Sequence, residues 1–444
     1  MVFFSLYGNN SVANLTECLD VMHMAERKLM KFAHRFVPPE SSTSCRINND
    51  TKTNSCLETD DGKVVDISLI DTEISKARVF GANQSSSITC QVQSGTSEKL
   101  SQTNADDDAL TIHGIKVICT CNHNSFAKEK TPLLLLHGYG NAALYFYRSL
   151  IGLSIQHYGT IYALDMLGWG LSSRPHFITE DKHVRGAEKF FVESIEAWRE
   201  ANKIKNFIIG AHSMGGYLAV AYAERYPHRV KSLILISPAG VPHKDEDAEN
   251  AKWYSQPLLQ RMILCFGRKI IWTLGITPFS IFRFWHYLLK SRARKFLDDH
   301  FSMIDSDEEK ATLCDYLLMN TMLPGSGEHI LSRVLEEGMF AIMPLVDRIP
   351  KLQVSSVSFL YGKLDWMDIN GGLEVQKICK DMKQNKESAP NVDVYEIKGA
   401  GHSPMLENWA EFNSAMVLSG GGKLHPKVPR PKILASSDFG DSES

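Results

Sequence analysis

The sequence predicts an α/β protein with a mostly parallel sheet that carries helices on both faces. Uncharged apolar runs, such as residues 132–136, 207–211 and 232–236, are typical of strands buried on both sides. They alternate with amphipathic stretches long enough to be helices, which is the order that builds a parallel sheet. A chain of 444 residues with a formal net charge of −3 suits one large domain with insertions, and it gives no basic signal for nucleic-acid binding.

The expected elements follow one another along the chain. Residues 16–37 have apolar side chains near helical spacing, with basic residues among them. Apolar and polar residues alternate along residues 63–70 and 109–121, as they do in antiparallel strands. Stretches rich in Ser, Thr and Asn between the expected elements favour flexible insertions. We therefore expect an N-terminal basic helix with a flexible segment (1–62), a first part of the α/β domain (63–237, with a disordered insertion at about 94–108), a helical cap (238–349), a second part of the α/β domain (350–420) and a disordered tail (421–444).

The stretch NFIIGAHSMGGYLAVAYAERYP, residues 206–227, has the layout of a nucleophile elbow around Ser213. Small residues must flank such a turn, because larger side chains would collide with the strand or the helix, and Ala211 and Gly215 meet this need. The usual pattern is G-x-S-x-G, so Ala211 makes this a variant. The alternative for the pentapeptide alone is a chance serine in a strand–helix turn. At the start of the helix, the Met214 N–H is expected to bind an oxyanion.

A histidine–glycine turn ends another predicted strand, at residues 137–140 (HGYG). In a hydrolase of this layout the backbone turns sharply beside the nucleophile, so the Tyr139 N–H is the expected second oxyanion donor. By itself, a strand that ends in His-Gly is only weak evidence for an oxyanion site, because this dipeptide also ends ordinary strands.

An aspartate and a histidine complete the expected site. YGKLDWMD offers two carboxylates, and we favour Asp365 over Asp368 because Asp365 lies three residues past the strand-ending Gly362. His402 follows the last predicted strand. The order serine, aspartate, histidine is that of the α/β-hydrolase fold and not that of the chymotrypsin or subtilisin folds. The sequence therefore predicts a Ser213–His402–Asp365 triad.

These motifs resemble the α/β-hydrolase-domain proteins four and five and their plant and fungal relatives. The resemblance rests on ALDMLGWGLSSRP, on the segment from FFVESIEAW to ISPAGVP around Ser213, and on YGKLDWMD, and it spans roughly residues 130–419. It implies an enzyme that acts on phospholipids or lysophospholipids without a cofactor. One branch of the family lacks the serine and serves as a co-activator of a triglyceride lipase, whereas this chain has Ser213.

The resemblance also implies acyl transfer as an alternative activity. Many relatives carry H-x-x-x-x-D at the catalytic histidine, a pattern associated with acyltransferase activity. Here the residues are His402 and Glu407, so a glutamate stands where the pattern has an aspartate and only the negative charge is kept. An acyl-enzyme on Ser213 gives hydrolysis if water resolves it, or acyl transfer if a lysolipid hydroxyl does, with acyl-CoA as co-substrate. The sequence does not decide between these two outcomes.

The predicted cap indicates a lipid surface as a partner. Residues 252–295 contain no Asp or Glu, but many Lys, Arg, Trp and Phe, a mixture that fits an anionic lipid interface. The alternative is an ordinary cap whose apolar side covers a pocket. The N-terminal basic helix is expected to add a second contact, because one weak anchor rarely holds a protein on a membrane.

Cysteine usage and hydropathy indicate an intracellular protein. Nine cysteines are scattered, and Cys119 and Cys121 have no second pair at zinc-ligand spacing, so we expect reduced thiols and no metal. Residues 1–11 lack the basic region of a secretory signal, and no apolar run reaches the roughly 18 residues of a spanning helix. The expected location is cytoplasmic, peripheral on a lipid droplet, the endoplasmic reticulum or a mitochondrial membrane.

We therefore expect a serine hydrolase of phospholipid or lysophospholipid acyl esters, in lipid homeostasis. One alternative is a lysophosphatidic acid acyltransferase that makes phosphatidic acid. A second is a non-catalytic co-activator that binds a triglyceride lipase on lipid droplets. A third, a soluble esterase or epoxide-type hydrolase of small metabolites, is disfavoured by Ser213 and by the basic aromatic cap.

Overall fold

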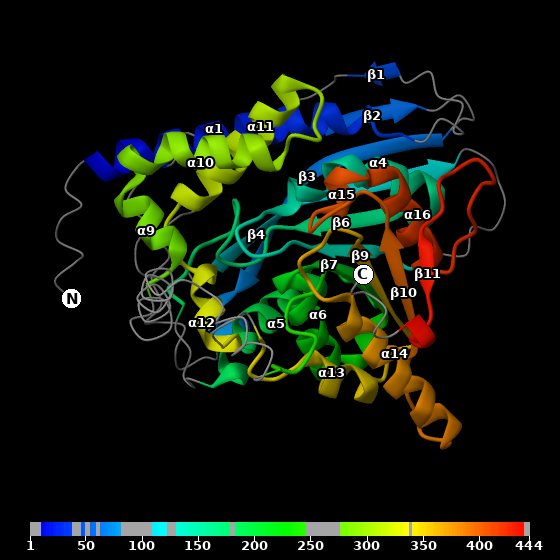
Figure 1. The fold of residues 1–444 in the computed structure, drawn as a ribbon. Coiled ribbons are helices and arrows are strands. Elements are labelled where there is room, and N and C mark those ends of the chain that lie inside the picture. Colours follow the sequence, from blue (N-terminus) through cyan, green and yellow to red (C-terminus); the bar gives the residue numbers. More distant parts are fainter. Residues whose placement is uncertain are drawn as a thin grey trace.

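A twisted sheet of eleven strands forms the centre of the described part of the chain (Figure 1). The computed structural model describes residues 10–37, 46–48, 54–58, 63–80, 109–121, 130–177, 183–245, 276–336 and 340–438. In chain order its strands are β1 (Arg46–Asn48), β2 (Asn54–Glu58), β3 (Lys63–Ser75), β4 (Ala109–Cys121), β5 (Leu133–Leu136), β6 (Thr160–Leu164), β7 (Phe207–His212), β8 (Val230–Ile236), β9 (Ser356–Gly362), β10 (Asn391–Ile397) and β11 (Lys432–Leu434).

The strand order is β1-β2-β3-β4-β6-β5-β7-β8-β9-β10-β11. Neighbours from β6 to β10 run parallel, whereas β1 to β4 form an antiparallel edge and β4 pairs antiparallel with β6. The uncharged apolar runs of the sequence are the parallel strands, and the alternating segment 109–121 is β4. The prediction of an α/β-hydrolase fold with a mostly parallel sheet is confirmed.

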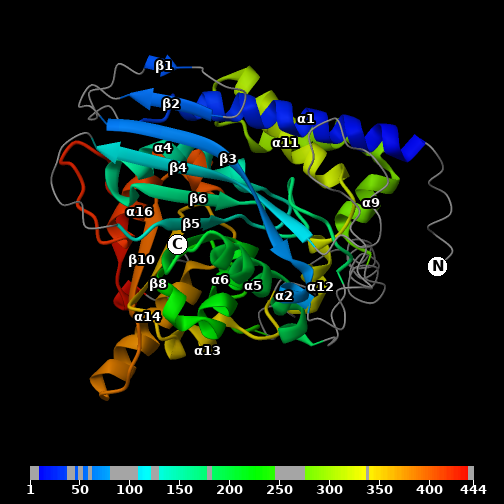
Figure 2. The same ribbon diagram turned by 180° about the vertical axis from the view of Figure 1, so that it is seen from behind.

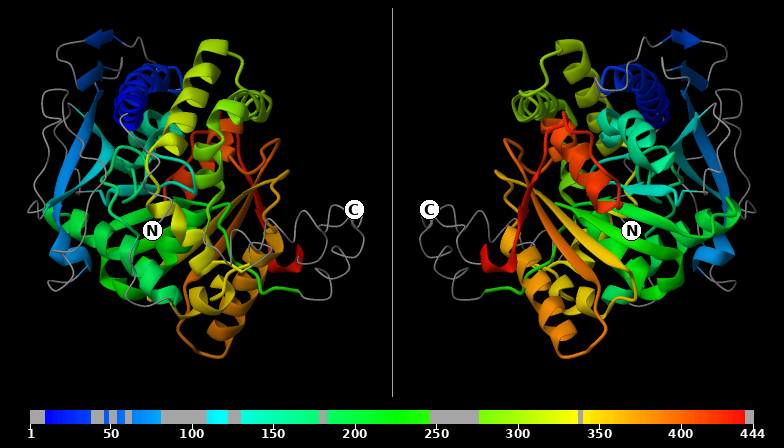
Figure 3. Two further views of the ribbon diagram at one scale, coloured as in Figure 1. Left: turned by 90° about the vertical axis from the view of Figure 1, so that its left-hand side faces the viewer. Right: turned by 90° about the vertical axis from the view of Figure 1, so that its right-hand side faces the viewer.

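Helices lie on both faces of the sheet, as the end-on views of Figure 3 show. The helices are α1 (Asn10–Ala33), α2 (Lys76–Phe80), α4 (Tyr147–Leu153), α5 (Val184–Ala201), α6 (Met214–Arg225), α9 (Pro278–Phe284), α10 (His286–His300), α11 (Asp307–Met322), α12 (Leu331–Val334), α13 (Leu345–Arg348), α14 (Ile369–Gln384), α15 (Pro404–Glu407) and α16 (Trp409–Ser419). Of the expected cap, α9, α10 and α11 pack on one another, whereas α13 packs on α6 and α14.

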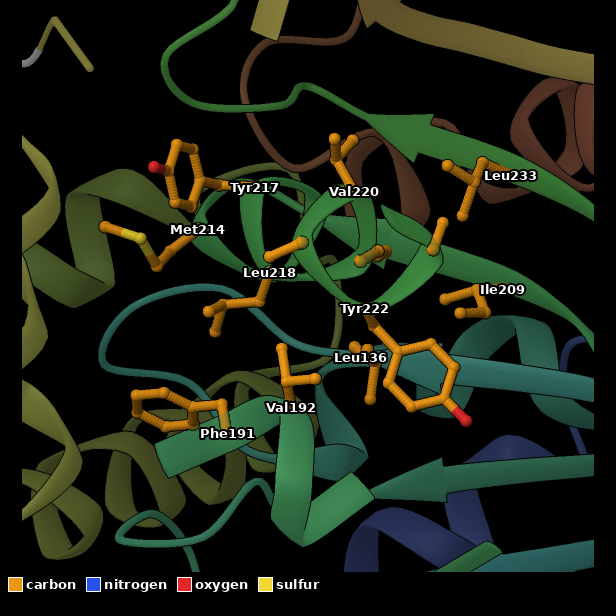
Figure 4. Close-up of a cluster of buried hydrophobic side chains, with 14 of the residues drawn as sticks. Leu136, Phe191, Val192, Ile209, Met214, Tyr217, Leu218, Val220, Tyr222 and Leu233 are labelled. Atoms are coloured by element: carbon orange, nitrogen blue, oxygen red, sulfur yellow. The ribbon is translucent and has the colours of Figure 1, made fainter. Parts of the chain in front are cut away.

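The alternation of side chains along each strand divides the core into two clusters. On β5, Leu134 and Leu136 point into the cluster under α5, α6 and α14, whereas Leu133 and Leu135 point into the cluster under α4, α16 and α1. Figure 4 shows part of the first cluster, around α6. Because both faces are buried, the strands at the centre of the sheet need apolar residues at every position.

Two segments that the sequence predicted to be flexible or disordered contribute strands. β1 and β2 fall in the N-terminal segment that ends at residue 62, and they extend the antiparallel edge at β3. β11 falls in the expected tail and pairs with β10, with Val394 opposite Leu434. An edge strand gives the backbone N–H and C=O groups of its neighbour a partner, so even a polar or basic segment is stabilised there. The expected insertion at 94–108 and residues 439–444 lie outside the described residues.

The N-terminal helix α1 lies along the cap helix α11 (Figures 1 and 2) and also packs on α4. Its apolar side chains Met22, Leu29 and Phe32 are buried in the second core cluster. Its basic residues Arg27 and Lys28 are exposed. The helix therefore packs by its apolar face on the protein itself, and Arg27 and Lys28 lie on its exposed face.

A buried carboxylate ties α1 to the sheet. Glu26 has no exposed surface, and its Oε1 lies 2.9 Å from Nε2 of His113 on β4, whose Nδ1 lies 2.7 Å from Oδ1 of Asp71 on β3. Burial alone would raise the pKa of Glu26, but the charge and the hydrogen bond of His113 outweigh it and lower this pKa to about 2. Burial alone would lower the pKa of His113, but its two carboxylate partners hold it well above its ordinary range.

We expect Glu26→Gln to lower the free energy of unfolding by about 3 kcal/mol, because it leaves one side of the buried His113 uncompensated. The pKa of Glu26 is depressed, so its contribution is complete above the ordinary value of 4.5 and is lost as the pH falls towards 2. The pKa of His113 is raised, so its contribution is complete below 6.5 and is lost as the pH rises through the raised value.

Urea unfolding at pH 5.5 and pH 3 measures this contribution. The wild type should exceed Glu26→Gln most at pH 5.5, and the difference should shrink at pH 3. The matched control is Glu17→Gln, an exposed residue of the same helix. Equal stability of Glu26→Gln and the wild type at pH 5.5 would contradict the expectation.

Candidate active site

Ser213 lies in the turn between β7 and α6 with a strained backbone. Its φ of 53° and ψ of −120° are unusual for a residue with a side chain, and such a conformation costs about 1–3 kcal/mol. Backbone hydrogen bonds tie it to β8 and to the turn after β8, because the Ser213 N–H donates to the Ile236 carbonyl (2.9 Å) and the Ser213 carbonyl accepts from the Ala239 N–H (3.2 Å). Strand β8 and the turn after it therefore fix the elbow.

Crowding around the elbow explains which small residues it requires. A Cβ on Gly215 would lie 2.9 Å from the Leu136 carbonyl oxygen, and one on Gly216 would lie 3.0 Å from Cβ of Pro238. A Cβ on Gly210 would lie 2.9 Å from a methyl group of Leu135, whereas the methyl group of Ala211 is accommodated in the buried core. The departure from G-x-S-x-G is therefore compatible with the turn.

Three side chains from the carboxyl ends of β7, β9 and β10 meet beside this turn. His402 Nε2 lies 3.2 Å from Ser213 Oγ, and His402 Nδ1 lies 3.0 Å from Asp365 Oδ1. The Asp365 carboxylate is almost fully buried, whereas His402 keeps 17% of its side chain exposed. Such a chain of contacts lets the histidine accept the serine proton while the aspartate holds the ring.

The second candidate acid, Asp368, has a different task. It is exposed and stands at the N-cap of α14, where its Oδ1 accepts a hydrogen bond of 2.9 Å from the Asn370 N–H. Of the two aspartates it is therefore Asp365 that contacts His402.

Charge and burial set the protonation of the site. Burial alone would raise the pKa of Asp365, but its hydrogen bond to His402 and the charge of that ring lower it below the ordinary range. Burial, together with the charge of His402, lowers the pKa of His212 to about 3, so His212 is neutral. Its Nε2 lies 2.8 Å from the His402 carbonyl oxygen and therefore donates to it. His212 holds the backbone of His402 and does not compete for the proton.

The two expected oxyanion donors flank Ser213. Met214 is the first residue of α6, so its N–H has no partner within the helix. On the other side, a Cβ on Gly138 would lie only 2.9 Å from Ser213 Cβ, so the chain that leaves β5 passes directly beside the serine and continues into Tyr139. The Tyr139 ring stacks on Phe279 of α9, with 5.2 Å between ring centroids.

Glu407 holds the loop that carries His402, a role that the sequence did not reveal. Its Oε2 accepts from the Gly401 N–H (2.5 Å) and its Oε1 accepts from the Ser403 N–H (2.9 Å). These amides belong to the residues on either side of His402. Both oxygens of the acid in the H-x-x-x-x-E pattern are thus engaged with the backbone of the histidine loop. A carboxylate five residues after a loop histidine is the only sequence signal for this contact.

Asp165 is a second residue whose role the sequence did not reveal. This buried aspartate directly follows β6, and it accepts from the Ala143 N–H (2.7 Å) and from the Leu171 N–H (2.8 Å). Gly170 has a φ of 52°, and a Cβ there would collide with the Asp165 carboxylate. Burial raises the pKa of Asp165 to about 6. The segment ALDMLGWG therefore builds the turn after β6 around one carboxylate.

Within the described ranges, the structure contains no group of three or more His, Cys, Asp or Glu side chains placed to hold a metal ion. The helices in those same ranges include none that is long and apolar enough to cross a membrane. The site itself brings together a serine nucleophile, a histidine base and a buried carboxylate.

The fold and this arrangement define the class of the protein, an enzyme of the α/β-hydrolase type. The family model for the alpha/beta hydrolase fold matches residues 131–265. The chain is 31% identical over 303 residues to 1-acylglycerol-3-phosphate O-acyltransferase ABHD5 of Rattus norvegicus, covering 66% of this chain and 77% of the relative.

Two further relatives have similar overlap. A (lyso)-N-acylphosphatidylethanolamine lipase of Mus musculus is 30% identical over 294 residues, which covers 65% of this chain and 79% of the relative. A probable 1-acylglycerol-3-phosphate O-acyltransferase of Oryza sativa is 30% identical over 315 residues, which covers 68% of this chain and 72% of the relative. The chain belongs to the family of α/β-hydrolase-domain proteins four and five.

The contact between Asp365 and His402 leads to a prediction for two matched variants. Asp365→Asn should lower kcat for a soluble ester, p-nitrophenyl butyrate, by about 10⁴-fold, because the amide favours the wrong histidine tautomer. Asp368→Ala should keep kcat within about threefold and lower the free energy of unfolding by about 1 kcal/mol, the typical cost of a lost N-cap. Steady-state kinetics and thermal unfolding measure both effects. A larger kcat loss in Asp368→Ala than in Asp365→Asn would reverse the assignment.

Proposed function

We propose that the protein is a serine hydrolase that cleaves acyl esters of phospholipids or lysophospholipids through an acyl-enzyme. The observation that carries the proposal is the hydrogen-bonded chain Ser213–His402–Asp365 at the carboxyl edge of the sheet. The strained elbow supports it, because backbone strain of this kind is characteristic of functional sites.

The proposed mechanism uses these groups in order. His402 takes the Ser213 proton as Oγ attacks the ester carbonyl, and Asp365 stabilises the imidazolium that forms. The Met214 and Tyr139 amides bind the oxyanion, each contributing about 3–4 kcal/mol to the transition state by analogy with comparable sites. His402 then protonates the leaving alcohol, and Ser213 carries the acyl group. Water activated by His402 releases the fatty acid. No step requires a cofactor.

The lipid substrate class rests on the relatives and on the cap. The relatives are named as a lipase of lyso-N-acylphosphatidylethanolamine and as acyltransferases of 1-acylglycerol-3-phosphate, and both kinds of substrate are glycerophospholipids. On the cap, Phe284, Trp285 and Phe296 are more than half exposed. Exposed aromatic side chains beside cations are suited to the headgroup region of a bilayer.

Acyl transfer to a lysophospholipid is the second candidate, favoured by the names of two relatives. It would use the same acyl-enzyme, with acyl-CoA as donor and a lysolipid hydroxyl in place of water. Glu407 adds no extra base for such a step, since both of its oxygens bind backbone amides. The two activities therefore differ in which acceptor reaches the acyl-enzyme. The assembled triad speaks against a third role, a purely non-catalytic co-activator of a triglyceride lipase.

Lipid products from purified protein test the proposal. Wild type, Ser213→Ala and the control Ser149→Ala, a buried serine outside the site, are incubated with phosphatidylcholine or with lysophosphatidic acid plus acyl-CoA. Fatty acid release by the wild type and the control, reduced at least 10³-fold in Ser213→Ala, is the expected result. Phosphatidic acid that depends on Ser213 would make the protein a transferase. No difference between wild type and Ser213→Ala would refute catalysis and favour the co-activator.

We further propose that the protein docks peripherally on anionic intracellular membranes or lipid droplets through the cap. Two of the cations that the sequence assigned to this surface are engaged elsewhere. Arg283 pairs with Glu328 (2.5 Å) and Arg294 pairs with Asp315 (2.5 Å). Arg292 and Lys295 remain exposed on α10. Much of the cationic and aromatic run, residues 252–275, lies outside the described residues.

Sedimentation with vesicles tests this docking. Trp285→Ala combined with Arg292→Ala should reduce binding to phosphatidylserine vesicles severalfold, because each surface cation contributes about 1 kcal/mol at an anionic bilayer. The pair Arg27→Ala and Lys28→Ala on α1 probes the second expected contact. Unchanged binding of both double variants would exclude these surfaces as the anchor.

A further inference from the structure

We infer that Asn320, on the cap helix α11, is a positioning residue that sets the geometry of the oxyanion loop, residues 138–141. The inference rests on the proposed function, because it concerns the donor that Tyr139 supplies. Asn320 lies outside every motif that predicted the site, about 100 residues along the chain from the serine. It nevertheless binds the backbone of this loop directly.

The Asn320 side chain is buried and fully hydrogen-bonded. Its Nδ2 donates to the carbonyl oxygens of Gly140 and Asn141, each at 3.0 Å. Its Oδ1 accepts from the Gly170 N–H and from the Arg174 guanidinium, each at 2.9 Å. One amide thus joins the turn after β5 to the turn after β6.

The chemistry of the partners fixes the orientation of this amide. The nitrogen faces two acceptors and the oxygen faces two donors, so a flipped amide would lose all four hydrogen bonds. Asn320 is only 2% exposed, so no such loss would be repaired by bulk water. The side chain therefore has a single arrangement, and the loop carbonyls are held to it.

The loop that Asn320 holds is the one that presents the Tyr139 N–H. Gly138 lies against Ser213 at one end of this loop, and Gly140 has a φ of 79° at the other, where a Cβ would lie 2.7 Å from the Phe279 ring. Tyr139 lies between these two glycines. Rotation of the Gly140 peptide would be transmitted to Tyr139, and a donor displaced by about 1 Å no longer stabilises the oxyanion.

The cap therefore has a part in catalysis besides covering the sheet. Asn320 does not touch the reacting atoms. It acts through the loop, and its effect is expected in the transition state, where the oxyanion exists, and not in binding of the ester. Loss of the amide should lower kcat with little change in KM.

Asn320→Asp separates the two hydrogen bonds that the side chain donates from the two that it accepts. The carboxylate still accepts from Gly170 and Arg174, but it cannot donate to the loop carbonyls. Asn320→Ala removes all four bonds and is the second variant. Thr312→Val is the control, because Thr312 is a buried polar residue of the same helix whose hydroxyl donates to the backbone of its own helix, at Glu308.

Hydrolysis of p-nitrophenyl butyrate by the full chain measures kcat, KM and the pH profile. We expect both Asn320 variants to lose about 10²-fold in kcat, with KM within threefold of wild type and the same pH midpoint, since the triad is unchanged. Thr312→Val should keep the wild-type kcat.

Either of two kinetic results would overturn the inference: kcat within twofold of wild type in both Asn320 variants, or a raised KM with kcat unchanged. A change confined to thermal stability would assign Asn320 a structural role only, and it would also overturn the inference. Failure of the proposed function is recognised separately. In that case the wild type itself would show no turnover that depends on Ser213, and the inference would fall with it.

Discussion

The backbone of Ser213, held at positive φ between a strand and a helix, is the constraint on which the rest of the site depends. Strand β8 accepts its N–H through Ile236, and the start of α6 packs so closely on the end of β5 that Gly215 has no room for a side chain. The parallel order of β5, β7 and β8 creates this crowding. A strained turn persists only where the surrounding structure is too rigid for it to relax. The centre of a sheet that is buried on both faces provides that rigidity.

The loops at the carboxyl edge of the sheet share one design, in which a buried or partly buried polar side chain binds backbone groups of a neighbouring loop. Glu407 holds the amides on both sides of His402, Asp165 holds the turn after β6, and Asn320 holds the carbonyls of the oxyanion loop. Each contact fixes a loop without contributing a reacting group. Such support keeps a site within the narrow geometry that catalysis requires.

The sequence predicted the fold and the three contacting side chains because their signals are local. Apolar runs identify the buried strands, and Ser213, Asp365 and His402 come shortly after the ends of β7, β9 and β10. The supporting residues were not predictable in this way. Glu26 and His113 are joined only through space, as are Asn320 and Gly140, and a polar helical residue looks like any exposed one until its partners are known. For the same reason β11 was expected to be disordered, because its pairing with β10 and the burial of Leu434 depend on residues far away in the sequence.

The most direct test of the account is to trap the acyl-enzyme. The protein is mixed with an excess of p-nitrophenyl butyrate, quenched in acid within the first turnovers and digested, and the peptide that contains Ser213 is analysed by mass spectrometry. We expect a butyryl group on Ser213 in the wild type, a stronger signal when deacylation is slowed, and no adduct in Ser213→Ala. An unmodified Ser213 peptide during measurable turnover, or an adduct on another residue, would contradict the central claim that Ser213 is the nucleophile.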